Sequence, residues 1–391
     1  MIAIIGGGPA ALGAAFALRQ SAEILERNSF LGKKLLLSGA GQCNFTNAAS
    51  TTEFLKHLGD YRHWLKPAFY AFDNVKMMDL VASAGCPIFI REDGKVFPKS
   101  MKSADLRDSL VDLLLSQGTK IHYQSKVLDL LPIADGFEIR IAGCAPVMAH
   151  KVIIASGGAS WPQTGSDGFS YDLAQRLGHE VLPAKPALAA VEIREYGPYI
   201  QCAGLGIKGA NLALGKKRFT GDLLFTHQGF SGPVILDNSY LMNAGDILKI
   251  YFADGARLLP LLKEHPKKKL GLILPQLGLS KSLALAMLTK LGIAIDITPS
   301  ELRAKDRKRL EAYLGGAEFE IRKLENLDTA MSDYGGVSLK EVSAKSMESK
   351  KIMGLFFAGE SLAYSLPSGG FSIQMAFSTG YLAGLKAMNS I

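Results

Sequence analysis

The first apolar run of the chain predicts a strand that leads through a glycine turn into a helix. MIAIIGGG is apolar up to its glycines, and PAALGAAFALRQ continues with good helix formers at helical spacing. Gly6 and Gly8 allow a tight turn and a close approach to a pyrophosphate, whose charge is stabilised at the start of the helix, Pro9 and Ala10. Ala11 takes the third position of the GxGxxG/A pattern. The pattern predicts a nucleotide-binding loop.

The next apolar run, SAEILERN, predicts a second strand that ends at Glu26. Glu26 follows Gly6 by twenty residues, the spacing at which an acidic residue accepts hydrogen bonds from an adenosine ribose. Each signal alone is weak, since glycine turns before helices are common and Glu26 could simply end a strand. Strand, glycines, helix and acid together favour a cofactor that contains ADP. NAD and FAD share this half, so the first loop does not choose between them.

A second glycine-bearing turn lies in KKLLLSGAGQCNFTN, directly after the Glu26 strand. Its Gly39-Ala40-Gly41 backbone is permissive enough to lie against a cofactor. The side chains that offer hydrogen-bond donors there are Lys33, Lys34, Ser38, Asn44 and Thr46. We expect this segment to form a second wall of an extended cofactor site.

Two middle segments add to the same site. HKVIIASGGASWPQTG is an apolar strand that carries Gly157 and Gly158 to the edge of the sheet, although an ordinary sharp turn explains these glycines equally well. TKIHYQSKVLDL predicts paired strand segments in which the backbone of Val127 meets the adenine.

The C-terminal pattern favours a flavin. GLFFAGE predicts a buried strand that ends at Gly359 and Glu360, and a final helix begins at Phe371 after Gly369 and Gly370. The amides and the positive dipole at the start of that helix would stabilise the negative charge that grows on a flavin pyrimidine ring during reduction. Enzymes that bind only NAD have no need of this feature, so the sequence predicts FAD.

Composition and charge exclude several classes of protein. The 391 residues are 48% hydrophobic and 20% charged, which is ordinary for a globular protein. The four cysteines form no CxxC and suggest no metal site, and a reducing, cytoplasmic setting fits them. We expect no export signal, because no basic residue precedes the first apolar run, and no membrane span, because lysines interrupt the later ones.

From Ala187 to about Gly335 the pattern changes to short apolar runs separated by glycines and charges, which predicts a barrel or a sandwich. Three helical stretches interrupt it, beginning at ARLLPLLKEH. The net charge of +8 is concentrated there, since Leu259 to Tyr313 holds 11 basic and five acidic residues. Nucleic acid is one interpretation, but Tyr313 is the only aromatic residue in this window, so a solvated helical face is favoured and no nucleic-acid partner is expected.

Seven blocks of the chain, among them GKKLLLSGAGQCNFTNA, ASGGASWPQTGSDG, LLFTHQGFSGPVIL and SGGFSIQMAFSTGYLAG, resemble a family of bacterial FAD flavoproteins described as NAD(P)/FAD-dependent oxidoreductases. The family includes aminoacetone oxidase-like proteins and 3-dehydro-bile acid delta(4,6)-reductases. The resemblance implies a glutathione-reductase-type α/β FAD-binding Rossmann domain, discontinuous in sequence, with inserted β-barrel and small helical domains. The implied boundaries are 1–187 and 335–391 for the FAD domain, 188–258 and 316–334 for the barrel, and 259–315 for the helical insert.

The same resemblance implies a set of residues that line FAD. They are Gly6, Gly8, Glu26, Lys34, Ser38, Gly41, Asn44, Val127, Gly158, Gly359, Glu360, Gly369 and Gly370. The sequence departs from the family pattern at Ala11, where a glycine is usual, and at Gln42, where an arginine is usual. The second change removes a fixed charge on the flavin side.

His227 in FTHQGFSGP is the candidate acid or base, because histidine changes protonation near neutrality, and a structural histidine that ties its loop is the alternative. Cys43 could touch the flavin or simply pack. No second GxGxxG follows the first, so any NAD(P)H would visit as a diffusible co-substrate. We expect an FAD-dependent oxidoreductase acting on a small or steroid-like organic substrate at the junction of barrel and FAD domain. A flavin-dependent RNA-modifying enzyme and a flavin-binding sensor without turnover remain as alternatives.

Overall fold

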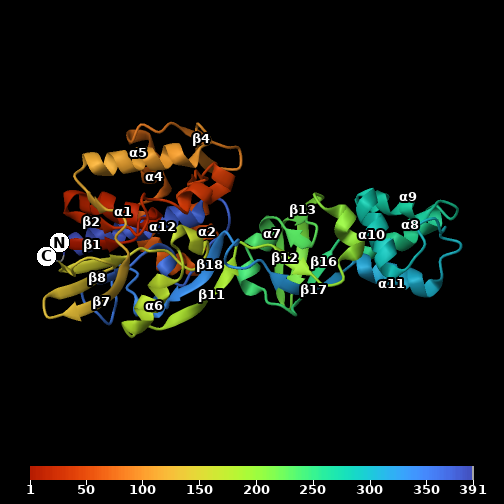
Figure 1. Ribbon diagram of the computed structural model, residues 1–391. Coiled ribbons are helices and arrows are strands. Elements are labelled where there is room, and N and C mark those ends of the chain that lie inside the picture. The colour runs from red at the N-terminus through yellow and green to blue at the C-terminus, as the bar shows by residue number, and fades with distance from the viewer. Residues whose placement is uncertain (390–391) are drawn as a thin grey trace. The chain divides into compact units, whose positions relative to one another are not determined.

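The computed structural model describes residues 1–389, and the chain divides into two compact units (Figure 1). Unit 1 comprises Met1–Ala187 and Leu327–Ile391, and unit 2 comprises Leu188–Asn326. The sequence placed the return to the FAD domain at residue 335, which is too late. Strand β18 (Ser332–Val337) pairs antiparallel with β11 (Val181–Ala187), and ahead of it the Leu327 carbonyl accepts the Trp161 amide at 2.9 Å, so the returning segment belongs to unit 1 from Leu327 onward.

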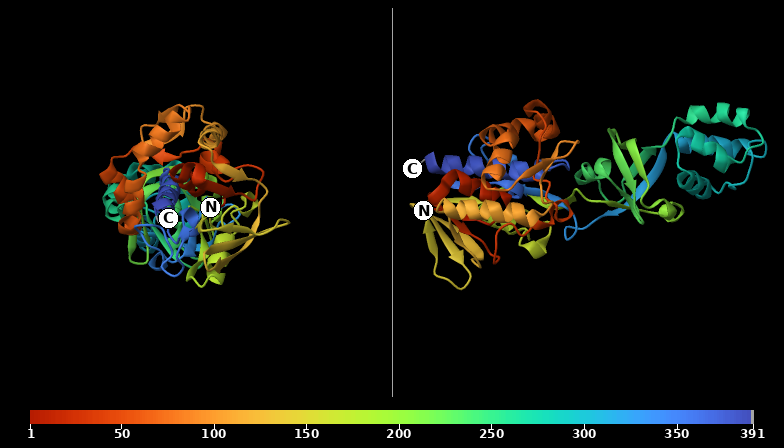
Figure 2. Two further views of the ribbon diagram at one scale, coloured as in Figure 1. Left: turned by 90° about the vertical axis from the view of Figure 1, so that its left-hand side faces the viewer. Right: turned by 90° about the horizontal axis from the view of Figure 1, so that it is seen from above.

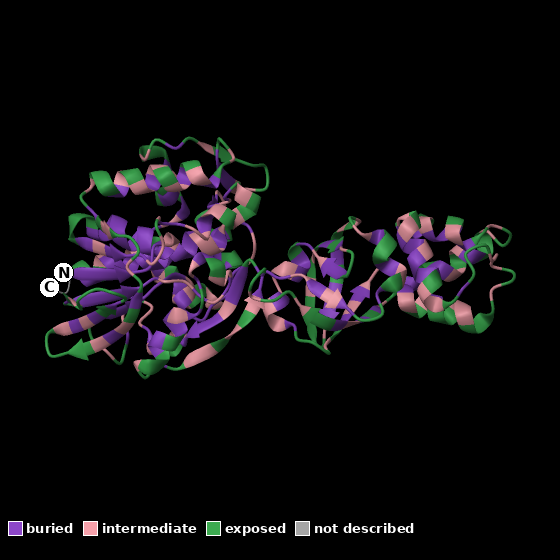
Figure 3. Ribbon diagram, in the orientation of Figure 1, coloured by how far each residue is buried: buried purple, intermediate pink, exposed green. Residues whose placement is uncertain are grey.

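A five-stranded parallel sheet forms the centre of unit 1. The strands lie in the order β19 (Leu355–Phe357), β10 (Lys151–Ile154), β1 (Ile2–Ile5), β2 (Ala22–Leu25) and β6 (Lys120–His122). Every residue of β1, β10 and β19 is buried, which explains why these strands read as continuous apolar runs (Figure 3). Because the strands are parallel, their carboxyl ends meet at one edge.

Helix α1 (Pro9–Leu18) packs along the C-terminal helix α12 (Phe371–Asn389), as Figure 2 shows. Small residues allow this approach, since a Cβ on Gly13 would meet the backbone of Phe377 and one on Gly384 would lie 2.5 Å from the Ala14 carbonyl oxygen. The other α-helices of unit 1 are α2 (Thr51–His57), α3 (Arg62–Ala71), α4 (Asn74–Ser83), α5 (Ser103–Ser116) and α6 (Phe169–Arg176).

Two three-stranded antiparallel sheets accompany the central sheet and the β11–β18 pair in unit 1. They are β3 (Thr46–Asn47), β5 (Lys95–Pro98) and β4 (Ile88–Ile90), and β7 (Val127–Ile133), β8 (Gly136–Ile141) and β9 (Val147–Ala149). The expectation that the strand segments of TKIHYQSKVLDL pair with each other was wrong. Strand β6 joins the edge of the central sheet beside β2, whereas β7 pairs with β8.

Unit 2 contains a closed six-stranded barrel rather than a sandwich. The strands follow the order β12 (Val191–Ile193), β15 (Gly229–Ser231), β14 (Lys217–Phe225), β13 (Gly206–Leu214), β16 (Ile247–Tyr251) and β17 (Ala317–Leu324). The helices are α7 (Pro233–Leu236), α8 (Leu258–Glu264), α9 (Leu270–Ile273), α10 (Lys281–Leu291) and α11 (Ala304–Leu314). Barrel and helices share one hydrophobic core, which includes Phe319 from the barrel and Leu283 from α10.

Within residues 1–389, no single helix has the length and apolar character needed to cross a membrane. Only the segments Leu270–Leu277 and Lys281–Leu291 meet that test when taken together, and they are bent by 119°.

Candidate cofactor site

The first glycine loop is closed on its sheet side and open on the other. Gly6 donates its amide to the Leu25 carbonyl at 2.9 Å and has a φ of +105°, and a Cβ there would lie 2.6 Å from the Ala155 carbonyl oxygen. A Cβ on Gly8 would have no atom within 4 Å. Gly8 is the N-cap of α1 and Pro9 its first residue, so free amides and the positive helix end face this open space. The loop offers room and charge for a pyrophosphate.

Glu26 follows β2 directly and is 5% exposed. Its Oε1 accepts hydrogen bonds from the backbone amide of Asn28 at 2.7 Å and from the Asn28 side chain at 2.6 Å. Its Oε2 lies against Gly7, where a Cβ would approach it to 2.5 Å. Burial raises the pKa of Glu26, and the bonds from Asn28 oppose that shift. One carboxylate oxygen is therefore anchored while the other lies beside the glycine loop, as ribose binding requires.

The segment before Val127 lies beside Glu26, because the Ser125 amide donates to the Glu26 carbonyl at 2.8 Å. Val127 itself is buried at the start of β7. On the neighbouring strand end, the Oγ atom of Ser156 is buried and has no hydrogen-bond partner among the described residues. Such an orphaned donor next to the Gly6 backbone fits a site that receives a polar ligand.

The second glycine segment contacts the other walls through Lys34. Its ammonium donates to Ser160 Oγ at 2.6 Å and pairs with Glu360 Oε2 at 2.7 Å. Gly39 and Gly41 adopt φ values of +57° and +86°, which only glycine takes without strain. The segment thus combines a positive side chain with a permissive backbone.

The polar side chains of this segment are mostly engaged within the protein. Ser38 donates to the Leu35 carbonyl at 2.7 Å, and the buried Thr46 hydroxyl donates to Gln374 at 2.5 Å. Asn44 Oδ1 accepts the Val96 amide at 3.2 Å, and its NH2 group makes no hydrogen bond within residues 1–389. Of the donors expected here, Lys33, Lys34 and Asn44 keep N–H groups that form no bond within residues 1–389.

The C-terminal wall contacts both earlier loops. A Cβ on Gly359 would lie 2.8 Å from that of Ala10, and a Cβ on Gly370 would lie 2.5 Å from the carbonyl oxygen of Thr46. Gly369 and Gly370 have positive φ values, so the turn that opens α12 requires glycine. Phe371 is buried against Phe54 and His57, with ring centroids 4.8 and 4.6 Å away. Phe371 therefore packs the start of α12 against α2.

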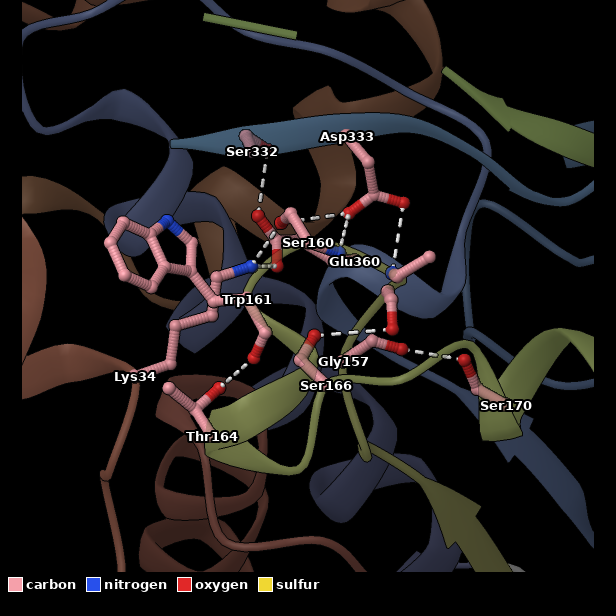
Figure 4. Close-up of polar contacts among 12 residues, drawn as sticks. Lys34, Gly157, Ser160, Trp161, Thr164, Ser166, Ser170, Ser332, Asp333 and Glu360 are labelled. Carbon is pink, nitrogen blue, oxygen red and sulfur yellow. Dashed lines mark hydrogen bonds and ion pairs between the residues drawn. The ribbon is translucent and has the colours of Figure 1, made fainter. Parts of the chain in front are cut away.

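A buried polar cluster joins these walls (Figure 4). Its members Asp333, Tyr171, Ser160 and Ser332 were not predicted from the sequence. Asp333, on β18, is 2% exposed and accepts hydrogen bonds from the amides of Ala159 and Ser160 at 3.1 and 3.3 Å. The Tyr171 hydroxyl lies 2.5 Å from Asp333, and Ser332 donates to Glu360 Oε1 at 2.7 Å. Asp333 is the one charged residue of β18, whose sequence is SDYGGV, and this was the available signal. Gly158 must be glycine here, because a Cβ would meet the Asp333 carboxylate.

The two candidate reactive residues, His227 and Cys43, lie in different units. His227 is exposed in the turn between β14 and β15 of unit 2, and its ring makes no hydrogen bond within residues 1–389. Thr226 ties that turn instead, by accepting the Gly229 amide at 3.1 Å. Burial raises the pKa of the Cys43 thiol to about 12, so Cys43 is a packing residue.

Comparison with known proteins places this geometry in context. A family model described as HI0933-like protein Rossmann domain matches residues 1–386. Over 398 residues, the chain is 30% identical to a ribosomal RNA dihydrouridine synthase of Haemophilus influenzae, with 98% of this chain and 97% of that protein covered. Over 413 residues, it is 29% identical to a 3-dehydro-bile acid delta(4,6)-reductase of Clostridium scindens, with 99% and 98% covered.

Among solved structures, 3-ketosteroid delta1-dehydrogenase from Sterolibacterium denitrificans in complex with 1,4-androstadiene-3,17-dione aligns with a TM-score of 0.52 at 12% identity. The alignment covers all of this chain and 99% of that one. At this identity the likeness concerns the fold alone. Together with the family match and the strand topology, it confirms the predicted Rossmann-type FAD-binding fold with an inserted barrel.

Proposed function

This chain belongs to the HI0933-like family of Rossmann-domain proteins and is an FAD-dependent oxidoreductase, and we propose that it reduces a ring C=C bond conjugated to a carbonyl group in a small or steroid-like molecule. The observation that carries the proposal is the convergence of the Gly6–Gly8 loop, Glu26 and the Lys34–Glu360 pair in one glycine-lined site. The substrate class is suggested by the relative named as a bile acid reductase, which aligns over 99% of this chain.

Each protein group has a proposed task toward the cofactor. The amides at Gly8 and the N-terminus of α1 bind the pyrophosphate, and Glu26 accepts the ribose hydroxyls. The Lys34 ammonium offsets the negative charge of Glu360 and that of the bound cofactor. The N-terminus of α12 stabilises negative charge on the pyrimidine edge of the ring. When bound, FAD supplies the two-electron chemistry, with a diffusible NAD(P)H as the proposed reductant.

The relatives' names support one common type of reaction. A delta(4,6)-reductase and a dihydrouridine synthase both add two hydrogens to a ring C=C bond that is conjugated with a carbonyl group. A second candidate substrate is therefore a pyrimidine base in RNA. It is favoured by the basic part of unit 2, where Lys305 and Lys308 on α11 and Lys267 in the turn before α9 are exposed and form no ion pair within residues 1–389.

The test begins with the absorbance spectrum of the purified protein, followed by anaerobic mixing with NADH and then NADPH while the flavin band is followed. Rapid bleaching by one nucleotide supports the reductase. Reoxidation of the reduced protein by a 3-oxo-4,6-diene steroid would then favour the small-molecule substrate. Reoxidation only by uridine-containing RNA, with affinity that falls steeply with salt, would favour the second candidate. A protein that neither contains nor binds FAD would refute the proposal.

A further inference from the structure

We propose that Asp333 is a positioning residue for FAD, whose protonated carboxyl group holds Tyr171, the Ala159–Ser160 backbone and Glu360 in the arrangement that receives the cofactor. The inference rests on the FAD-dependent function given above and extends it to a residue that no glycine motif contains.

The carboxyl group of Asp333 organises the loop that follows β10. Its Oδ2 accepts the Ala159 amide at 3.1 Å, and its Oδ1 accepts the Ser160 amide at 3.3 Å and the Ser160 hydroxyl at 3.1 Å. Figure 4 shows Asp333 reaching from β18 to this loop. Two neighbouring amides and one hydroxyl are thus satisfied by a single side chain that water does not reach.

A count of protons at Tyr171 indicates that Asp333 is protonated. The Tyr171 hydroxyl lies 2.5 Å from Asp333 Oδ2 and 3.0 Å from the carbonyl oxygen of Glu360, yet it has one proton to donate. Two separate full hydrogen bonds form if Asp333 donates to the Tyr171 oxygen and Tyr171 donates to Glu360, whereas an ionised Asp333 would leave the single Tyr171 proton shared between two acceptors. Burial and the negative charge of Glu360 raise the pKa of Asp333 and outweigh the opposing effects of Lys34 and of the hydrogen bonds with Tyr171 and Ala159, so the direction agrees with this assignment.

The cluster is connected to the cofactor site through two charged residues. Ser160 accepts a hydrogen bond from Lys34 at 2.6 Å, and Lys34 also pairs with Glu360. The titratable groups that face Asp333 are Lys34, Glu360 and Tyr171, and only Lys34 is positive. Ionisation of Asp333 would therefore break the proton chain to Glu360 and add a second negative charge where an anionic dinucleotide is to bind.

The test measures the Kd of FAD by flavin fluorescence across a series from acidic to alkaline pH. Wild-type affinity should be constant while Asp333 is protonated and should fall as pH rises through its raised pKa. In Asp333→Asn, each of the two orientations of the side-chain amide places its NH2 group against a backbone N–H, that of Ala159 in one orientation and that of Ser160 in the other. We expect it to bind FAD at least about tenfold more weakly at low pH, the value of one lost hydrogen bond, and without the wild-type pH dependence.

Two further variants make the result decisive. Tyr171→Phe removes a single oxygen and should also weaken FAD binding and flatten the pH profile, which keeps the test valid if Asp333→Asn does not fold. Asp328→Asn removes an exposed carboxylate from the same returning segment and should leave both unchanged. Wild-type Kd and pH profile in both Asp333→Asn and Tyr171→Phe would overturn the inference alone. Failure of the wild-type protein to bind FAD would overturn the proposed function with it.

Discussion

Replacement of Gly8 by alanine should weaken FAD binding without disturbing the fold. Gly8 has φ −85° and ψ −175°, which alanine adopts freely, and its Cβ would meet no protein atom within 4 Å. Loss of glycine entropy in the unfolded chain stabilises the variant by about 0.4–1 kcal/mol, and the poorer N-cap costs a similar amount. The free energy of unfolding should therefore change little.

The added methyl group would instead stand where the pyrophosphate approaches the α1 amides. Loss of one hydrogen bond to a charged group costs ~1.5–3 kcal/mol, which corresponds to roughly a 10- to 150-fold rise in the Kd of FAD. Fluorescence titration measures the Kd, and urea denaturation of the cofactor-free protein measures stability. Wild-type affinity in Gly8→Ala would show that the pyrophosphate does not bind at this loop.

Gly6→Ala provides the contrast within the same loop. Its φ of +105° is strained for alanine, and its Cβ would lie 2.6 Å from backbone atoms of Ala155 and Ser156 that cannot move aside independently. Strain of this kind costs about 1–3 kcal/mol before the overlap is counted. We therefore expect Gly6→Ala to lower stability in the absence of FAD, whereas Gly8→Ala does not.

Three further predictions concern buried polar groups. Thr46→Val leaves Gln374 Oε1 without its buried donor and should lower the free energy of unfolding by about 1–3 kcal/mol in urea denaturation. Tyr313→Phe removes the 2.6 Å partner of the buried Tyr199 hydroxyl and should cost a similar amount, with barrel and helices of unit 2 still melting together because they share one core. Burial lowers the pKa of His179 below its ordinary 6.5. As pH falls below 6.5, the unfolded chain therefore binds this proton before the folded protein does, and the free energy of unfolding should decline. His179→Gln removes the imidazole, so the decline should be smaller in that variant.

Matched changes at exposed positions serve as controls for these three. Thr52→Val, Tyr123→Phe and His63→Gln alter the same chemical groups where solvent is accessible, and each should change stability by less than about 0.5 kcal/mol. Equal losses in a control and its buried counterpart would contradict the stated cause. Separate melting transitions for the barrel and the helices would contradict the shared core.

The sequence by itself determined the elements and the order in which they supply the site. Apolar runs that end in glycine marked the carboxyl ends of β1, β10 and β19, and parallel pairing necessarily brings such ends to one edge. Glu26 could be placed beside the Gly6 loop because their spacing is local and fixed by one strand–helix–strand unit. These features depend on periodicity and on backbone conformation, which neighbouring residues largely set.

Only the tertiary structure decided how the polar groups are used. Asp333 and Tyr171 are separated by 162 positions and meet only because β18 returns beside β11, a pairing that no local pattern specifies. The same holds for Thr46, whose hydroxyl looked available to a cofactor and is instead committed to Gln374 on α12. Burial of a charge and choice of a distant hydrogen-bond partner arise from packing of the whole chain, and so the residues that organise the site became visible only in the fold.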